Sequence, residues 1–152
     1  MRTLIVLAVA SIVAFAADNS LGTWKLNIEK STYTPAPMPF KSVTIVREAF
    51  ADGVRVTTTV GRADGSQINF TYNEIHDDEE HPVPGAGSPF DTISTNQIDA
   101  NTFTDKRRKI GGSFESAVRT VISLDGKTMT TNAKGINAEG KPFSDTLVFD
   151  KQ

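Results

Sequence analysis

The chain has 152 residues, a formal net charge of −2 and no cysteine. This length suits one domain, and the lack of cysteine excludes disulfides, thiol catalysis and cysteine-ligated metal sites. The near-neutral charge argues against a nucleic-acid partner, because phosphate contacts need a concentrated basic face.

The first 17 residues are predicted to be a signal peptide. Arg2 is an early cation, Leu4–Val13 is an apolar run, and residues 14–16 form a small-x-small cleavage site. A membrane anchor is the alternative, but a span needs about 20 apolar residues and this run is shorter. Cleavage after Ala16 or Ala17 would leave residues 18–152 as one exported domain, secreted or periplasmic.

The first strand of this domain is predicted over Gly22–Ile28. Trp24, Leu26 and Ile28 alternate with polar residues there, which is typical of a half-buried strand. The segment 30–40 follows and is predicted to be an extended loop, because its three prolines lack amide donors.

The rest of the chain reads as short strands separated by turns, with no convincing helix. Asp52-Gly53 and Asp64-Gly65 are typical hairpin turns, and the segment 76–89 is predicted to be a long loop. The predicted strands are 41–49, 54–61, 67–75, 91–98, 102–109, 114–124, 128–134 and 143–149. Because sequential antiparallel strands leave exposed edges unless the sheet closes, we predict an all-β fold. It is a single antiparallel up-and-down barrel of about 8–10 strands, with room for packed side chains or one small ligand.

Two motifs resemble those of calycin barrels. Gly22-Thr23-Trp24-Lys25-Leu26 is similar to the Gly-x-Trp start of lipocalins and to the Gly-Thr-Trp-Lys-Leu start of fatty-acid-binding proteins, and 148–151 resembles the close of the latter. The whole mature chain also resembles a group of uncharacterised exported bacterial proteins, through 82–85, 98–102 and 125–128. The resemblance implies a lipocalin-like barrel that binds a small apolar or amphipathic ligand.

The chain departs from the fatty-acid-binding proteins at two places. Those proteins have two short helices after the first strand, where this chain has its proline-rich loop. They hold the ligand carboxylate with an Arg-x-Tyr pair in the last strand, where this chain has Leu147 and Phe149. They are also cytosolic. The resemblance therefore implies the barrel without the fatty-acid site.

Five residues form the candidate ligand-binding set: Trp24, Arg47, Phe70, Tyr72 and Phe149. Trp24 is expected to seal one end of the barrel, with a place in a cavity wall as the alternative. The other three aromatic residues face inward, where they either line a pocket or fill the core. Arg47 lies on the inward face by parity, and it either pairs with a ligand carboxylate or extends to the rim; the rim is the preferred interpretation.

Other candidate chemistry is sparse. His76 and His81 flank the acidic residues 77–80, which suggests either a metal-dependent enzyme or, preferably, a solvated acidic loop, since the spacing matches no zinc motif. The basic run 106–109 is expected at an exposed hairpin end. Without a phosphate loop, a nucleophile elbow or a paired His-Glu motif, we predict no enzyme, no cofactor and no metal.

The expected partner is thus a small apolar ligand, with no nucleic acid and no integral membrane segment after signal cleavage. The alternative function is a filled barrel with a structural or protein-interaction role in the cell envelope.

Overall fold

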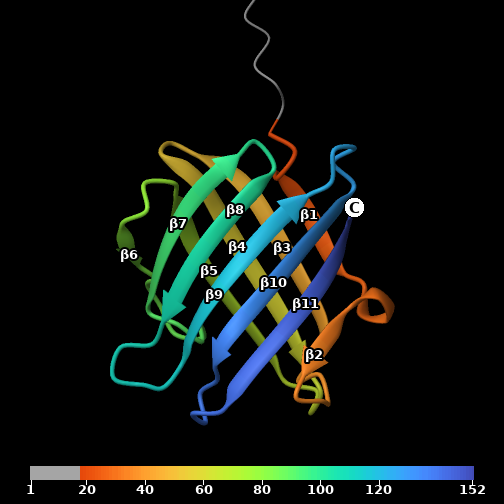
Figure 1. Ribbon diagram of the computed structural model, residues 1–152, viewed down its shortest axis with the longest axis vertical. Helices are drawn as coiled ribbons and strands as arrows, with labels where there is room; N and C mark the ends of the chain where they lie inside the picture. The colour runs from red at the N-terminus through yellow and green to blue at the C-terminus, as the bar shows by residue number, and fades with distance from the viewer. Residues whose placement is uncertain (1–17) are drawn as a thin grey trace, which may run out of the picture.

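The computed structural model describes residues 18–152, so the predicted signal peptide lies outside the described residues. Figure 1 shows antiparallel strands wrapped into a nearly closed barrel. Within residues 18–152 there is no α-helix, and no helix is long and apolar enough to cross a membrane. The predicted all-β barrel is confirmed.

The sheet has 11 strands. In chain order they are β1 (Gly22–Leu26), β2 (Thr32–Thr34), β3 (Phe40–Phe50), β4 (Gly53–Arg62), β5 (Gln67–Ile75), β6 (Glu80–Pro82), β7 (Thr92–Asp99), β8 (Thr102–Arg108), β9 (Glu115–Ile122), β10 (Thr128–Ile136) and β11 (Pro142–Lys151).

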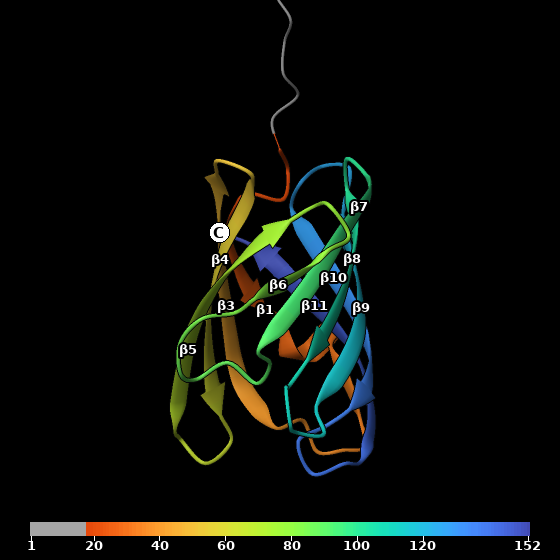
Figure 2. The ribbon, with the colours of Figure 1, turned by 90° about the vertical axis from the view of Figure 1, so that its left-hand side faces the viewer.

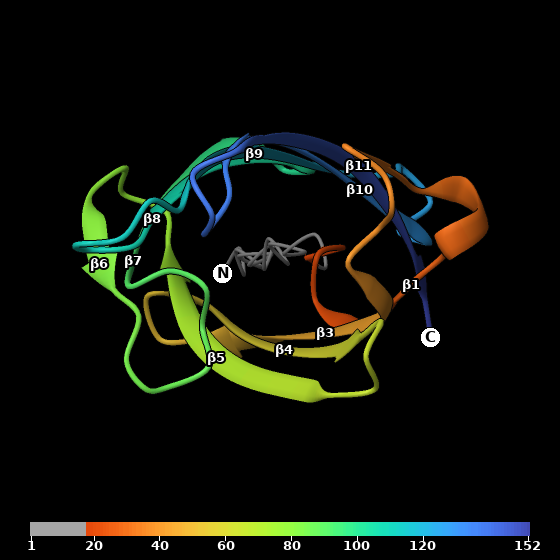
Figure 3. The ribbon, with the colours of Figure 1, turned by 90° about the horizontal axis from the view of Figure 1, so that it is seen from below.

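Consecutive strands pair as hairpins from β3 to β5 and from β6 to β11, and β1 joins these two runs by pairing antiparallel with both β3 and β11. Figure 3 looks along the barrel and shows β3–β5 on one side of the interior and β9–β11 on the other. The path of paired strands ends at β5 and at β6. Segment 83–91 runs across this seam (Figure 2), and its side chains Val83 and Phe90 are buried. Apolar packing therefore closes the barrel where strand pairing stops.

The structure differs from the sequence-based expectation at the first strand and in both long loops. β1 ends at Leu26, because the Asn27 side chain accepts a hydrogen bond from the Lys30 amide at 3.2 Å and starts a 3-10 turn over Ile28–Lys30. Ile28 is consequently 44% exposed instead of facing the core. The segments predicted to be loops contain β2 and β6, of three residues each.

Gly53 also has a different role from the one predicted. It is the first residue of β4 rather than a turn residue with positive φ. A Cβ atom at this position would clash with the carbonyl oxygen of Glu74 on β5. Glycine is therefore needed here for the close approach of two strands.

One half of the barrel interior is filled. Its core consists of Trp24, Val43, Phe103, Ile122, Met129 and Phe149. Trp24 is fully buried and donates its indole N–H to the carbonyl oxygen of Ser20 at 2.9 Å. The Lys151 ammonium lies 5.0 Å from the Trp24 ring centre and donates to the carbonyl of Asn19 at 3.0 Å. The segment before β1 is thus anchored over Trp24 at this end of the barrel. Trp24 lies where a residue that seals the barrel is expected.

Candidate functional site

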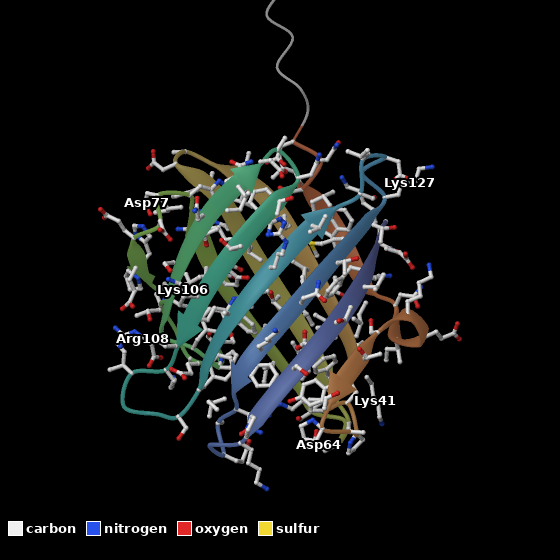
Figure 4. The ribbon with its side chains drawn as sticks, in the orientation of Figure 1. Lys41, Asp64, Asp77, Lys106, Arg108 and Lys127 are labelled. Carbon is white, nitrogen blue, oxygen red and sulfur yellow. The ribbon has the colours of Figure 1, made fainter. Side chains whose placement is uncertain are left out.

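The other half of the barrel contains a partly open cavity of about 320 Å³. It lies toward the end that carries Lys41 and Asp64 in Figure 4, opposite the end that carries Lys127. Its wall is mainly aromatic and aliphatic, with few polar groups. The aromatic lining residues are Tyr33, Phe40, Phe70, Phe114 and Phe143.

These aromatic rings pack against one another around the cavity. Tyr33 stacks on Phe143 with 6.0 Å between ring centres and meets Phe40 edge-on at 6.3 Å. Phe114 also stacks on Phe143, with 6.3 Å between ring centres. The short strand β2 holds Tyr33 in place by pairing it with Asp145 of β11. Because β2 was not predicted, the sequence did not identify Tyr33 as a lining residue.

Arg107 of β8 is the basic group of the inner cavity wall. Its Nη2 donates to Asp105 Oδ2 at 2.7 Å, and its guanidinium carbon lies 5.2 Å from the ring centre of Phe90. The Arg107 side chain is 22% exposed and that of Asp105 only 4%, so the guanidinium reaches the cavity with its charge paired behind it. Burial acts to lower the pKa of Arg107, but Tyr72 and Asp105 outweigh it and raise the pKa.

The basic run 106–109 lies at the exposed end of the hairpin of β8 and β9, as predicted, except that Arg107 is directed into the barrel. Strand alternation turns Lys106 and Arg108 outward, as Figure 4 shows, while Arg107 points inward. The outward Arg108 donates from Nε to Glu80 Oε2 at 2.8 Å. Only one residue of the run therefore belongs to the cavity.

Asp145 of β11 is the acidic group of the cavity. Its Oδ1 is buried and has no hydrogen-bond partner within the described residues. Burial raises the pKa of Asp145 to about 6, against the opposing effects of the Ala133 amide and of the Arg107 charge. Within residues 18–152 this carboxylate forms no ion pair, in contrast to Asp105.

Arg47 does not extend to the rim, which was the preferred interpretation of its sequence position. Its two terminal nitrogens donate to the two carboxylate oxygens of Glu74 at 3.0 and 2.7 Å, and both side chains are at most 5% exposed. On the intervening strand, Val56 pairs with Arg47 and Val54 pairs with Glu74, which places the two charges diagonally across β4. The buried arginine therefore already has a carboxylate partner within the chain.

The remaining candidates from the sequence lie in two regions. Phe70 lines the cavity. The ring of Tyr72 stacks on the ring of Phe70, with 6.1 Å between their centres. Trp24 and Phe149 belong to the filled half. Of the five candidates, only Phe70 contacts the cavity.

The two histidines do not form a site together. The His81 Nε2 of β6 lies 2.9 Å from Asp77 Oδ1 near the surface, whereas the His76 ring centre lies 5.3 Å from the ring centre of Phe103. Within residues 18–152 no group of three or more histidine or acidic side chains is arranged to hold a metal ion.

No protein-family model and no curated protein sequence matches this chain. Several solved structures do. An extracellular fatty acid binding protein, As-p18, has a TM-score of 0.57 and 14% identity, over 89% of this chain and 97% of the other. A Schistosoma mansoni fatty acid binding protein in complex with arachidonic acid has a TM-score of 0.54 and 12% identity, over 88% and 96%. Bovine odorant binding protein has a TM-score of 0.50 and 13% identity, over 95% and 78%.

The chain has a calycin-like barrel fold. At these identities the similarity establishes the fold alone. The ligand must therefore be inferred from the side chains of this barrel.

Proposed function

We propose that this protein is an exported carrier that binds one small amphipathic ligand inside its barrel. The observation that carries the proposal is the cavity of about 320 Å³, which has an aromatic wall and the polar groups of Arg107 and Asp145. Concave, mostly apolar sites with a few placed polar groups are typical of small-molecule binding. The volume is near the lower end of about 300–1,000 Å³ for such sites, which favours a small ligand.

The similar structures support a carrier function, because two are fatty acid binding proteins and one is an odorant binding protein.

The experiment is binding of N-phenyl-1-naphthylamine, an uncharged apolar probe that fluoresces in apolar sites. We expect saturable binding to the wild type, and loss of binding in Ala133→Phe or Ser116→Phe, which place a ring in the cavity. Ala117→Phe is the matched control, because Ala117 is exposed on the outer face of β9. Circular dichroism confirms that each variant is folded. Equal probe binding by all four proteins would overturn the proposal.

The alternative function, a filled barrel with a structural or protein-interaction role in the cell envelope, gains support from the filled half around Trp24 and Phe149. It predicts that the folded wild type binds no probe.

Export rests on the predicted signal peptide. N-terminal sequencing of the protein recovered outside the cytoplasm should begin at Ala17 or Asp18. Retention of Met1 in that protein would contradict cleavage.

A further inference from the structure

We propose that the cavity selects an organic cation, specifically an amphipathic amine, over a fatty-acid carboxylate. This inference rests on the proposed carrier function and names the ligand class of the same cavity. It follows from the arrangement of charges inside the barrel, from the unpartnered oxygen of Asp145 and from the aromatic wall.

The interior charges cancel in pairs except for one carboxylate. Arg47 pairs with Glu74 at 2.7 Å, and Arg107 pairs with Asp105 at 2.7 Å. Asp145 is left without an ion pair within residues 18–152, and it lines the cavity. A buried charge is stable when an opposite charge and hydrogen bonds compensate for its lost hydration. The charge that is missing from the cavity is therefore a positive one.

The hydrogen-bonding capacity of Asp145 points the same way. Its buried Oδ1 accepts no hydrogen bond within the described residues. An ionised carboxylate is an acceptor only, whereas an ammonium group provides three donors and no acceptor. A ligand ammonium would satisfy Oδ1, while a ligand carboxylate beside Asp145 would bring two like charges together.

Arg107 does not reverse this preference, although it lines the same cavity. Asp105 holds its Nη2, and the rings of Phe90 and Tyr72 lie 5.2 and 5.9 Å from the guanidinium carbon. Asp105 thus compensates its charge within the chain, although its buried Nε has no hydrogen-bond partner within the described residues. The other cationic lining residue, Arg62, is exposed at the end of β4, where solvent screens its charge.

The aromatic wall adds a second attraction for a cation. Tyr33 lies opposite Asp145 in the pairing of β2 with β11, and its ring stacks on Phe143. Burial and the nearby Asp145 carboxylate raise the pKa of Tyr33, so the phenol stays neutral beside the acid. Ring faces attract organic cations within about 6 Å of the ring centre. A carboxylate surrounded by rings is thus suited to an ammonium group with an apolar tail.

The test compares three ligands of equal chain length: octylamine, octan-1-ol and octanoate. Each is titrated calorimetrically and by displacement of N-phenyl-1-naphthylamine at pH 7.5. We expect octylamine to bind about 10-fold to 100-fold more tightly than either of the others, the usual effect of a hydrogen bond to a charged group. Asp145→Asn should remove this preference, so that octylamine binds the variant no more tightly than octanol does. Asp150→Asn, on the outer face of the same strand, is the matched control and should retain it.

A pH series on the wild type provides a measurement that does not depend on a variant. The titratable groups that face Asp145 are Arg107 from β8 and Tyr33 from β2, and neither changes charge between pH 5 and 8. Octylamine affinity should therefore fall by up to about tenfold for each pH unit below the Asp145 titration, and it should level off once it reaches the affinity of octanol.

The outcomes separate this inference from the carrier function. If neither the probe nor any of the three ligands binds, both fail. If octanoate or octanol binds as tightly as octylamine, or if Asp145→Asn keeps the amine preference, the carrier function stands and the amine selectivity is overturned.

Discussion

Asp145→Asn should stabilise the ligand-free protein at neutral pH and have little effect in acid. Burial raises the pKa of the folded Asp145 from 3.8 to about 6. The folded state therefore holds its proton at pH values where the unfolded chain has lost it. Below about pH 4 both states are protonated and the substitution is nearly neutral. As the pH rises from about 4 to 6, the unfolded wild type ionises while the folded wild type still holds its proton, so the stability of the wild type falls and then levels off above pH 6. The asparagine variant shows no such loss.

The expected size of this difference follows from the pKa. A value raised from 3.8 to about 6 corresponds to ~3 kcal/mol of lost stability once the carboxyl is ionised in both states. The side chain is only partly buried, so solvent reduces this penalty. We expect the variant to exceed the wild type in unfolding free energy by about 2 kcal/mol at pH 8.

Urea denaturation followed by tryptophan fluorescence measures this difference at pH 4, 6 and 8. The single tryptophan, Trp24, is fully buried in the filled half of the barrel, so its emission reports unfolding. Asp64→Asn is the control of opposite sign, because hydrogen bonds from the Ser66 side chain and amide lower the pKa of Asp64. That variant should lose stability relative to the wild type as the pH rises toward 4, and its difference from the wild type should then stay nearly constant from pH 4 to 8. An Asp145→Asn difference that is constant from pH 4 to 8 would refute the reasoning.

Three further substitutions test the fold. Glu74→Gln should lower the unfolding free energy by about 3–5 kcal/mol in urea titrations, because it leaves the buried charge of Arg47 uncompensated; a loss below about 1 kcal/mol would contradict a tight buried pair. Trp24→Phe should lower the unfolding free energy, followed by circular dichroism, by about 1–3 kcal/mol, since the buried carbonyl of Ser20 loses its donor. Unchanged amide exchange around Ser20 would argue against the anchoring role. Gly53→Ala should lower the melting temperature by several degrees, as a Cβ atom meets the carbonyl of Glu74; an unchanged melting temperature would show that the two strands separate easily there.

Most of the barrel could be predicted because strand position depends on local signals. The alternation over Gln67–Ile75 and its flanking turns predicted both ends of β5. β2 escaped prediction because a three-residue strand carries too little alternation to recognise, and because its partner Ser144–Thr146 is far along the chain.

Less of the site could be predicted, although the alternation of inward and outward residues along the strands would have identified part of it. The same alternation that placed Arg47 inside would have placed Arg107 inside, two residues beyond the buried Asp105. Likewise, Asp145 lies between Phe143 and Leu147 on the inward face of β11, as alternation requires. Which half of the interior is filled depends on side-chain volumes contributed by many strands, and a single sequence does not show how those volumes meet.

The seam between β5 and β6 has a mechanical consequence. Elsewhere in residues 18–152, widening the wall means breaking a ladder of backbone hydrogen bonds between two paired strands. At the seam, it requires that Val83, Phe90 and Ile93 separate from the apolar side chains of β4 and β5, with no ladder to break. Under a pulling force, or during the slow opening that amide exchange detects, the barrel should part along this line first. Its lowest-energy deformation is therefore an unrolling that keeps every strand ladder intact.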